Sequence, residues 1–195
     1  MELKINPGNI AILGMPHDEN SSFLRGPAKA PELIRAMRQS DSANAFTEAG
    51  IDLAGHPRLV EFGDITWSNE TVAFTELRRA IDHICSAGAY PLTFGGDHAI
   101  TFPIIEALSQ HHPDITILHF DAHPDLYDSM DDNPHSHASP FARIMERGLV
   151  KRLIQIGIRT LNTHQRSQVE RFGVECIEMK SWQGPEQVKL LGPVY

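Results

Sequence analysis

Short apolar runs alternate with amphipathic helical patterns along most of this chain, and this alternation limits the folds that it can adopt. Strands are predicted at Asn9–Leu13, Leu59–Phe62, Tyr90–Phe94, Ile115–Phe120, Leu153–Ile158 and Val174–Glu178. Helices are predicted at Ala30–Arg38, Glu70–Ala87, Thr101–Gln110, Pro140–Arg147, Thr163–Phe172 and Pro185–Leu190. Strands that alternate with helices favour a parallel sheet that is buried on both faces. We therefore predict an α/β fold with a mostly parallel sheet.

Size and composition narrow the classes of protein further. The 195 residues suffice for one domain, and 41% hydrophobic with 22% charged residues is typical of a globular protein. The net charge of −8 disfavours nucleic acid as a partner, because phosphate binding needs a basic surface. No apolar run is long enough to span a membrane and no signal peptide is recognised, so a cytoplasmic location is expected. Cys85 and Cys176 are interpreted as reduced, buried thiols.

The segment Asp121-Ala122-His123-Pro124-Asp125 follows the apolar run Ile115–Phe120 directly. Residues two apart in an extended chain point the same way, so Asp121, His123 and Asp125 can converge on one point. Carboxylate and imidazole ligands together suit Mn, Fe, Ni or Zn. A helix N-cap beside an unrelated histidine is the alternative, but it accounts for one of the three residues. The pattern therefore predicts a metal site.

His98 follows the run Tyr90–Phe94 in the segment Phe94-Gly95-Gly96-Asp97-His98. Parallel sheets bind ligands at the carboxyl ends of their strands, and both motifs lie at such ends. His98 is therefore a candidate ligand, although an isolated histidine there is equally compatible with a structural role. Asp97 is interpreted either as a residue that orients a ligand or as the cap of the following helix.

Other polar residues sit in loops at predicted strand ends. His135 and His137 follow the aspartate motif; a loop histidine is usually solvated, but near a metal site it can transfer protons. His17 and Asp18 follow the first strand, and with Arg25 they are interpreted as a structural turn.

These motifs together resemble those of the ureohydrolase (arginase/agmatinase) family, and most closely its agmatinase branch. The resemblance rests on FGGDH (Phe94–His98), HFDAHPDLYD (His119–Asp128) and SHASPF (Ser136–Phe141). It extends to GMPHD (Gly14–Asp18), RGP (Arg25–Pro27), APELIR (Ala30–Arg35) and IGIRT (Ile156–Thr160), and so covers nearly the whole chain. The combination of GGDH with DAHPD is the most specific part of the pattern.

The resemblance implies a three-layer α/β/α sandwich with a mostly parallel central sheet, and a centre of two Mn²⁺ ions. The ligand set alone leaves Fe, Ni and Zn open. By the resemblance, His98, Asp121 and Asp125 bind one ion, and His123 binds the other with Asp121 bridging. His137 matches the histidine that supplies protons. The implied reaction is agmatinase-like: a hydroxide that bridges the metals cleaves a small guanidino substrate to urea and an amine. The implied assembly is a homo-oligomer, a trimer or hexamer, with no nucleic acid and no membrane as partner.

One departure from the family pattern affects this expectation. Relatives carry a later Ser-x-Asp-x-Asp motif that supplies two more carboxylates, and no such pattern follows Asp125 here. The chain ends with Gly192-Pro193-Val194-Tyr195, which is typical of a turn followed by the start of a strand. We therefore expect residues 1–195 to form a single ureohydrolase domain that lacks its C-terminal strands, with weak or no activity alone.

Several alternatives stay open at this stage. Arginine, guanidinobutyrate, guanidinopropionate, guanidine and formimidoylglutamate are other substrates in such a family. The loop Asp128–Ser139 lacks the Asn-x-x-His pattern that arginases use for the α-amino acid end, which weakly favours a decarboxylated substrate. A non-catalytic, truncated paralogue is the alternative outside enzymes.

Overall fold

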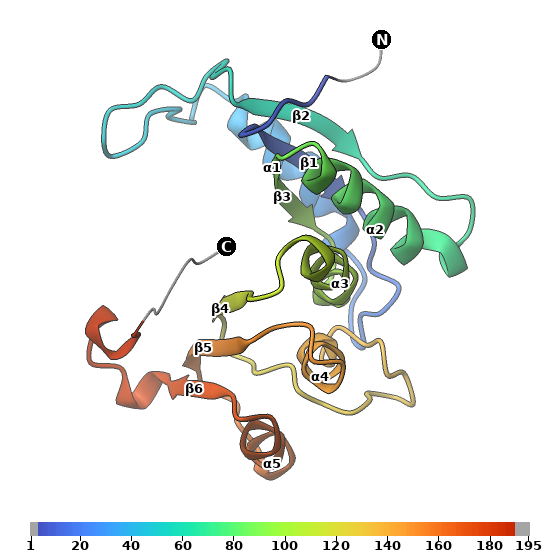
Figure 1. Cartoon of the computed structure of the whole chain (residues 1–195), viewed down its shortest axis with the longest axis vertical. Helices are drawn as coiled ribbons and strands as arrows, with labels where there is room; N and C mark the ends of the chain where they lie inside the picture. The colour runs from blue at the N-terminus through green and yellow to red at the C-terminus, as the bar shows by residue number, and fades with distance from the viewer. Residues whose placement is uncertain (1–3, 190–195) are drawn as a thin grey trace. The chain divides into compact units, whose positions relative to one another are not determined.

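The structure is a computed structural model that describes residues 4–189. The chain divides into two compact units, with the boundary between Leu108 and Ser109. Each unit contains its own three-stranded sheet, as Figure 1 shows. We describe the two units in turn.

The sheet of the first unit has the strand order β2-β1-β3. Its strands are β1 (Ile10–Met15), β2 (Leu59–Asp64) and β3 (Tyr90–Gly95). Both neighbours of β1 run parallel to it, with Ile10 opposite Leu59 on one side and opposite Tyr90 on the other. Parallel strands need crossover connections, and here the helices α1 (Ala30–Arg38) and α2 (Glu70–Ser86) lie within them.

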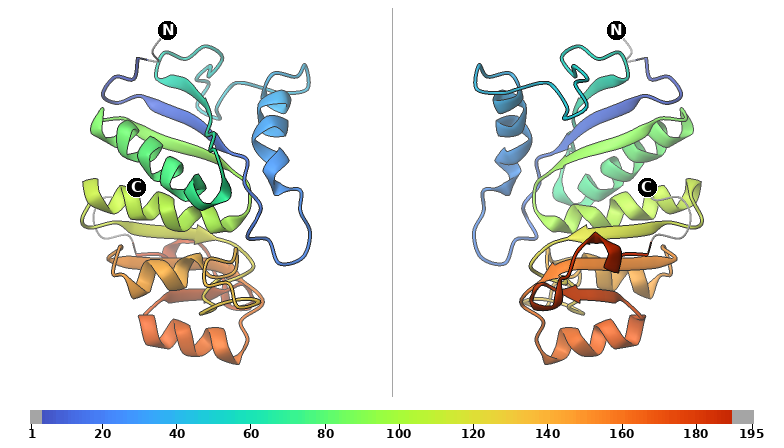
Figure 2. Two further views of the ribbon diagram at one scale, coloured as in Figure 1. Left: turned by 90° about the vertical axis from the view of Figure 1, so that its right-hand side faces the viewer. Right: turned by 90° about the vertical axis from the view of Figure 1, so that its left-hand side faces the viewer.

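The two faces of β1 pack against different helices. Ala11, Leu13 and Met15 point to one face, where they join the buried residues of α2 in the main hydrophobic core of this unit. Figure 2 shows α2 running alongside the strands. Gly14 points to the other face, where a Cβ atom would lie 2.8 Å from Cβ of Pro31 in α1. The first unit therefore carries helices on both faces of its sheet.

The sheet of the second unit has the order β4-β5-β6 and is also parallel. Its strands are β4 (Thr116–Phe120), β5 (Arg152–Ile158) and β6 (Glu175–Glu178). The central strand β5 is buried on both faces, as expected for a parallel sheet covered by helices. The helices are α4 (Pro140–Glu146) and α5 (Thr163–Phe172), and α3 (Thr101–His111) crosses the boundary between the units.

The predicted elements agree closely with the structure. All six strands and five of the six helices are present, and the bounds of α1 and α5 match the prediction. The predicted helix Pro185–Leu190 is wrong, because the chain forms only a 3-10 turn at Pro185–Gln187 and is extended again at Val188. Leu190 and the predicted turn and strand at Gly192–Tyr195 lie outside the described residues.

Further findings bear on the sequence predictions. The described strands form two three-stranded parallel sheets, whereas the sequence suggested one sheet. The described chain divides into two compact units, and the expectation that residues 1–195 form a single domain stays a prediction. Within residues 4–189, no helix combines the length and the hydropathy that crossing a membrane requires. Cys85 and Cys176 are free and half-buried, and burial raises the pKa of both thiols.

Candidate metal centre

Two hydrogen bonds with backbone groups hold Asp121 at the carboxyl end of β4. Its N–H donates to the carbonyl oxygen of Ile156 at 3.1 Å, which extends the parallel pairing with β5 by one residue. Its own carboxylate Oδ1 accepts from the N–H of His123 at 2.9 Å. The strand end therefore holds the Asp121 carboxylate in one direction, as an Asx turn does.

Three potential ligand side chains of the second unit lie together at this strand end. One atom from each of His119, Asp121 and Asp125 lies within 4.8 Å of the others. His119 and Asp125 are buried, whereas Asp121 is half-buried. The two carboxylates are oxygen donors of the kind that Mn and Fe accept. The residues present therefore fit the metal that the motif predicts.

The surroundings of His119 indicate how it acts in this group. The Gln155 amide nitrogen donates to the carbonyl oxygen of Pro124 at 2.6 Å, which fixes the orientation of the amide, because a carbonyl can only accept. The same nitrogen lies 3.3 Å from Nδ1 of His119, so Nδ1 is the acceptor and Nε2 carries the proton of the neutral ring. Nε2 lies 3.5 Å from Oδ2 of Asp121. With its Nε2 proton turned toward Asp121, His119 has no lone pair there to offer a metal.

Packing holds the His119 ring in this position. The ring lies against Phe141 of α4 with 4.4 Å between the ring centroids, and Gln155 is fully buried. Sequence reasoning missed both His119 and Gln155. The alternation that selected Asp121 and His123 extends back to His119, so that signal was present. Gln155 lies 36 residues from His119, and no local pattern pairs the two.

Asp125 has a left-handed backbone, with φ +48°. Such a conformation is uncommon outside glycine, although aspartate tolerates it better than most residues. The Asp125 carbonyl oxygen accepts from the N–H of Phe141 at 3.3 Å, near the start of α4. The backbone turn thus brings the Asp125 carboxylate back to Asp121, and residues held in this way often belong to functional sites.

The other two predicted ligands are His123 and His98. His123 has a side chain that is 61% exposed, and its Nδ1 lies 3.3 Å from Oδ1 of Asp121. His98 belongs to the first unit, where it begins the 3-10 turn His98–Ile100 that follows β3. The roles of His98 and His123 as ligands stay predictions.

Asp97, which precedes His98, has the role of a cap. Its buried carboxylate accepts from the N–H of Ala99 at 3.0 Å and from the N–H of Asn20 at 3.0 Å. Burial raises the pKa of Asp97, while the hydrogen bonds and nearby His17 act against that shift. The carboxylate thus ties the GGDH segment to the loop that follows β1.

His137 lies in an ordered loop of the second unit. A tight turn at Met130–Asn133 narrows the loop, and the N–H of Tyr127 donates to the carbonyl oxygen of Ala138 at 3.1 Å. Nδ1 of His137 lies 3.5 Å from Oγ of Ser136. The N–H of His135 donates to Oδ1 of Asn133 at 2.9 Å, a contact typical of an Asx turn. The role of His137 in proton transfer stays a prediction.

Asp18 has the structural role predicted for the turn. Its carboxylate accepts from the N–H of Gly26 at 2.6 Å and of Ala28 at 3.1 Å, and Arg25 lies 3.6 Å away. These contacts, the Gly26 hydrogen bond first, lower the pKa of Asp18. His17 is buried and its Nε2 lies 3.0 Å from Oε2 of Glu70.

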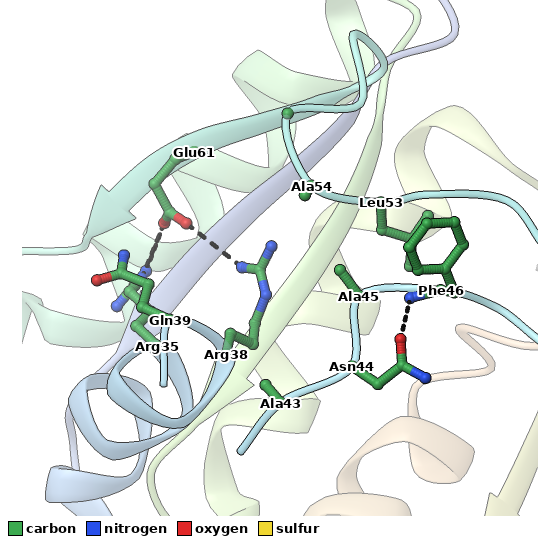
Figure 3. A pocket seen from close by; sticks show the side chains of 11 residues that line it. Arg35, Arg38, Gln39, Ala43, Asn44, Ala45, Phe46, Leu53, Ala54 and Glu61 are labelled. Carbon is green, nitrogen blue, oxygen red and sulfur yellow. Dashed lines mark hydrogen bonds and ion pairs between the residues drawn. The ribbon is translucent and has the colours of Figure 1, made fainter. Parts of the chain in front are cut away.

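A cavity of about 500 Å³ in the first unit lies between α1 and the segment 43–55 (Figure 3). Arg35 and Arg38 both face Glu61 there, at 2.9 Å and 3.8 Å. Phe46 and Leu53 form an apolar wall opposite. The charged groups of this cavity therefore pair with one another.

Comparison with known proteins agrees with the motifs and with the geometry at the end of β4. The family model described as the arginase family matches residues 8–189. The chain belongs to the arginase family. The α/β architecture with parallel strands is the arginase-like fold: the solved arginase from Medicago truncatula superposes with a TM-score of 0.82 at 38% identity, covering 89% of this chain and 57% of that one.

Curated members of the arginase family carry different substrate names. Arginase 1, mitochondrial, of Arabidopsis thaliana is 41% identical over 181 residues, which are 88% of this chain and 53% of the relative. The N(1)-aminopropylagmatine ureohydrolase of Thermus thermophilus is 32% identical over 171 residues, which are 85% of this chain and 56% of the relative. The chain thus spans about half the length of the curated relatives that it matches.

Proposed function

We propose that this arginase-family chain takes part in the metal-dependent hydrolysis of a guanidino compound to urea and an amine. The observation that carries the proposal is the pair of carboxylates, Asp121 and Asp125, held within 4.8 Å at the carboxyl end of β4. A buried aspartate with φ +48° beside a second carboxylate brings two negative charges together, and a cation offsets their repulsion.

The ligand set that we propose consists of Asp121 and Asp125 together with His98 and His123. Mn²⁺ is the proposed ion, although the same ligands suit Fe, Ni or Zn. When bound, such a centre lowers the pKa of water and so supplies hydroxide at neutral pH. This matters because a guanidinium carbon is a poor electrophile.

The chain's own residues have distinct proposed tasks. Asp121 offers its carboxylate, His119 lies beside that carboxylate with Nε2 3.5 Å from Oδ2, and Gln155 fixes the tautomer of His119. His137 is the proposed donor of the proton that the departing amine needs, because histidine titrates near neutral pH. A homo-oligomeric assembly belongs to the same proposal.

Two substrates are candidates. Agmatine is the substrate favoured by the sequence, because the loop Asp128–Ser139 lacks the Asn-x-x-His pattern described above. L-arginine is favoured by the relatives, because identity to a plant arginase is 41% against 32% for the aminopropylagmatine hydrolase. The chemistry at the guanidino group is the same for both.

A urea-release assay with added metal tests the proposal. The 195-residue chain is incubated with Mn²⁺, and separately with Fe²⁺, Ni²⁺ or Zn²⁺, and with agmatine or L-arginine. We expect slow urea release that depends on the metal and that Asp121→Asn abolishes. Asp114→Asn, which removes an exposed carboxylate of the same unit, is the matched control and should change nothing.

Two outcomes contradict the account. Absence of urea with every metal and both substrates, together with equal Mn²⁺ binding by the wild-type chain and Asp121→Asn, would overturn the proposed function. Rapid turnover would contradict the expectation that the later carboxylates of the family are needed for full activity.

A further inference from the structure

A cavity of about 350 Å³ opens at the carboxyl edge of the second unit's sheet, the edge on which Asp121 lies. This volume is within the range of small-ligand sites. The lining comes from the ends of β5 and β6 and from α5: Ile158, Arg159, Leu161, Arg166, Glu178 and Lys180. Neither the metal ligands nor His137 belongs to this lining.

The cavity carries an excess of positive charge. Arg166 lies 3.4 Å and Lys180 lies 3.0 Å from the Glu178 carboxylate, and these cations lower the pKa of Glu178, Lys180 first. Arg159 is exposed, and its guanidinium makes no hydrogen bond or ion pair with another residue in the range 4–189. One carboxylate therefore faces three cations, and Arg159 is the cation that it does not pair with.

The segment that carries Arg159 is tied directly to the candidate metal centre. The N–H of Arg159 donates to the carbonyl oxygen of Ala122 at 2.8 Å, and Oγ1 of Thr160 donates to the same oxygen at 3.1 Å. Gly157 passes close to Asp121, since a Cβ atom there would lie 3.2 Å from the Asp121 carbonyl oxygen. The cavity and the Asp121 carboxylate thus belong to adjacent strand ends.

We propose that Arg159, supported by Arg166 and Lys180, binds the carboxylate of a guanidino acid whose guanidino group reaches the candidate metal centre. A guanidinium fork matches a carboxylate with two parallel hydrogen bonds. Ile158 and Leu161 supply apolar surface for the aliphatic part of such a ligand. Agmatine lacks a carboxylate, so it offers Arg159 no anion to bind. This inference rests on the proposed function and selects guanidino acids over agmatine as its substrate class.

Ligand titrations of the 195-residue chain followed by NMR test the inference without a need for turnover. The probes are L-arginine, 4-guanidinobutyrate, agmatine and inorganic phosphate. The variants are Arg159→Gln, Arg159→Lys and the control Arg79→Gln, which removes an exposed arginine of the first unit. Unchanged backbone spectra establish that each variant is folded.

We expect the wild-type chain to bind both guanidino acids at least fivefold more tightly than agmatine. Arg159→Gln should raise the Kd for the acids about tenfold, Arg159→Lys should raise it less, and Arg79→Gln should leave it unchanged, in line with the loss of a charge-assisted bidentate contact. Agmatine binding should be unaffected by Arg159→Gln.

Three results would overturn the inference: agmatine binding as tightly as L-arginine, an Arg159→Gln variant with unchanged Kd for the acids, or phosphate binding as tightly as L-arginine, which marks a general anion site. These failures are distinct from failure of the proposed function. Loss of urea release with the Arg159 effect intact would refute the hydrolysis, whereas urea release without the Arg159 effect would refute only the carboxylate site.

Discussion

Replacing Gly96 by alanine should destabilise the first unit far more than the same change at its neighbour Gly95. A Cβ atom on Gly96 would clash with the carbonyl oxygen of His17 and lie 2.7 Å and 2.8 Å from the His17 carbonyl carbon and nitrogen. All three atoms are backbone. A Cβ on Gly95 would lie 2.7 Å from Cδ1 of Ile100, the end of a flexible side chain. Neither glycine has a positive φ, so the contrast isolates the steric effect.

The size of the effect follows from what must move. To make room for the methyl group, the segment at Gly96 must move away from the segment at His17. This movement breaks two hydrogen bonds, from Gly96 N–H to Met15 O (3.0 Å) and from Asp97 N–H to His17 O (2.8 Å). Losing both costs about 2 kcal/mol, and overpacking adds about 2 kcal/mol. We therefore expect about 4 kcal/mol for Gly96→Ala and about 1 kcal/mol for Gly95→Ala. For a chain of this length these costs lower Tm by about 12 °C and about 3 °C.

Thermal and urea denaturation measured by the fluorescence of Trp67 provide the assay. Trp67 belongs to the first unit, with its ring 5.7 Å from that of His17, and a Trp182→Phe background removes the signal from the second unit. Equal midpoints for Gly95→Ala and Gly96→Ala would refute the close approach of the two backbone segments.

Three more changes test other parts of the structure. Gln155→Leu should cost about 2–3 kcal/mol in urea denaturation, because the buried carbonyl oxygen of Pro124 loses its donor. Asp18→Asn should lower Tm at pH 7, because the folded state lowers the pKa of Asp18 and so gains stability while the carboxylate is charged. The difference from wild type should shrink as the pH falls below the ordinary pKa of 3.8, and a difference at pH 3 as large as that at pH 7 would contradict this. Asp125→Asn should keep Tm within a few degrees, because asparagine tolerates φ +48°, whereas Asp125→Val should unfold the second unit.

The strand ends that carry the candidate site could be predicted from the sequence because local patterns determine them. The apolar run before Asp121 fixes both the strand and the direction of its carboxyl end. The helix predicted at 185–190 is wrong. Gly184 takes φ +134° and Val188 is extended, so the chain forms a single 3-10 turn between them. Local propensity alone gives no sign of that stop.

Contacts between distant residues could not be predicted in this way. Gln155 meets the carbonyl oxygen of Pro124 across 31 residues, and this contact decides the tautomer of His119. The left-handed Asp125 likewise accepts a hydrogen bond from the distant residue Phe141. The alternation of Asp121, His123 and Asp125 predicted that their side chains converge, but the chain leaves the extended conformation at Asp125. His119, which the pattern did not select, also lies within 4.8 Å of the two carboxylates.

Binding of Mn²⁺ to the 195-residue chain, followed by electron paramagnetic resonance of the free ion, tests the central claim most directly. The account predicts saturable binding to the wild-type chain, a Kd at least tenfold higher for Asp121→Asn, and no change for the control Asp114→Asn. Equal binding by the wild-type chain and Asp121→Asn would contradict it.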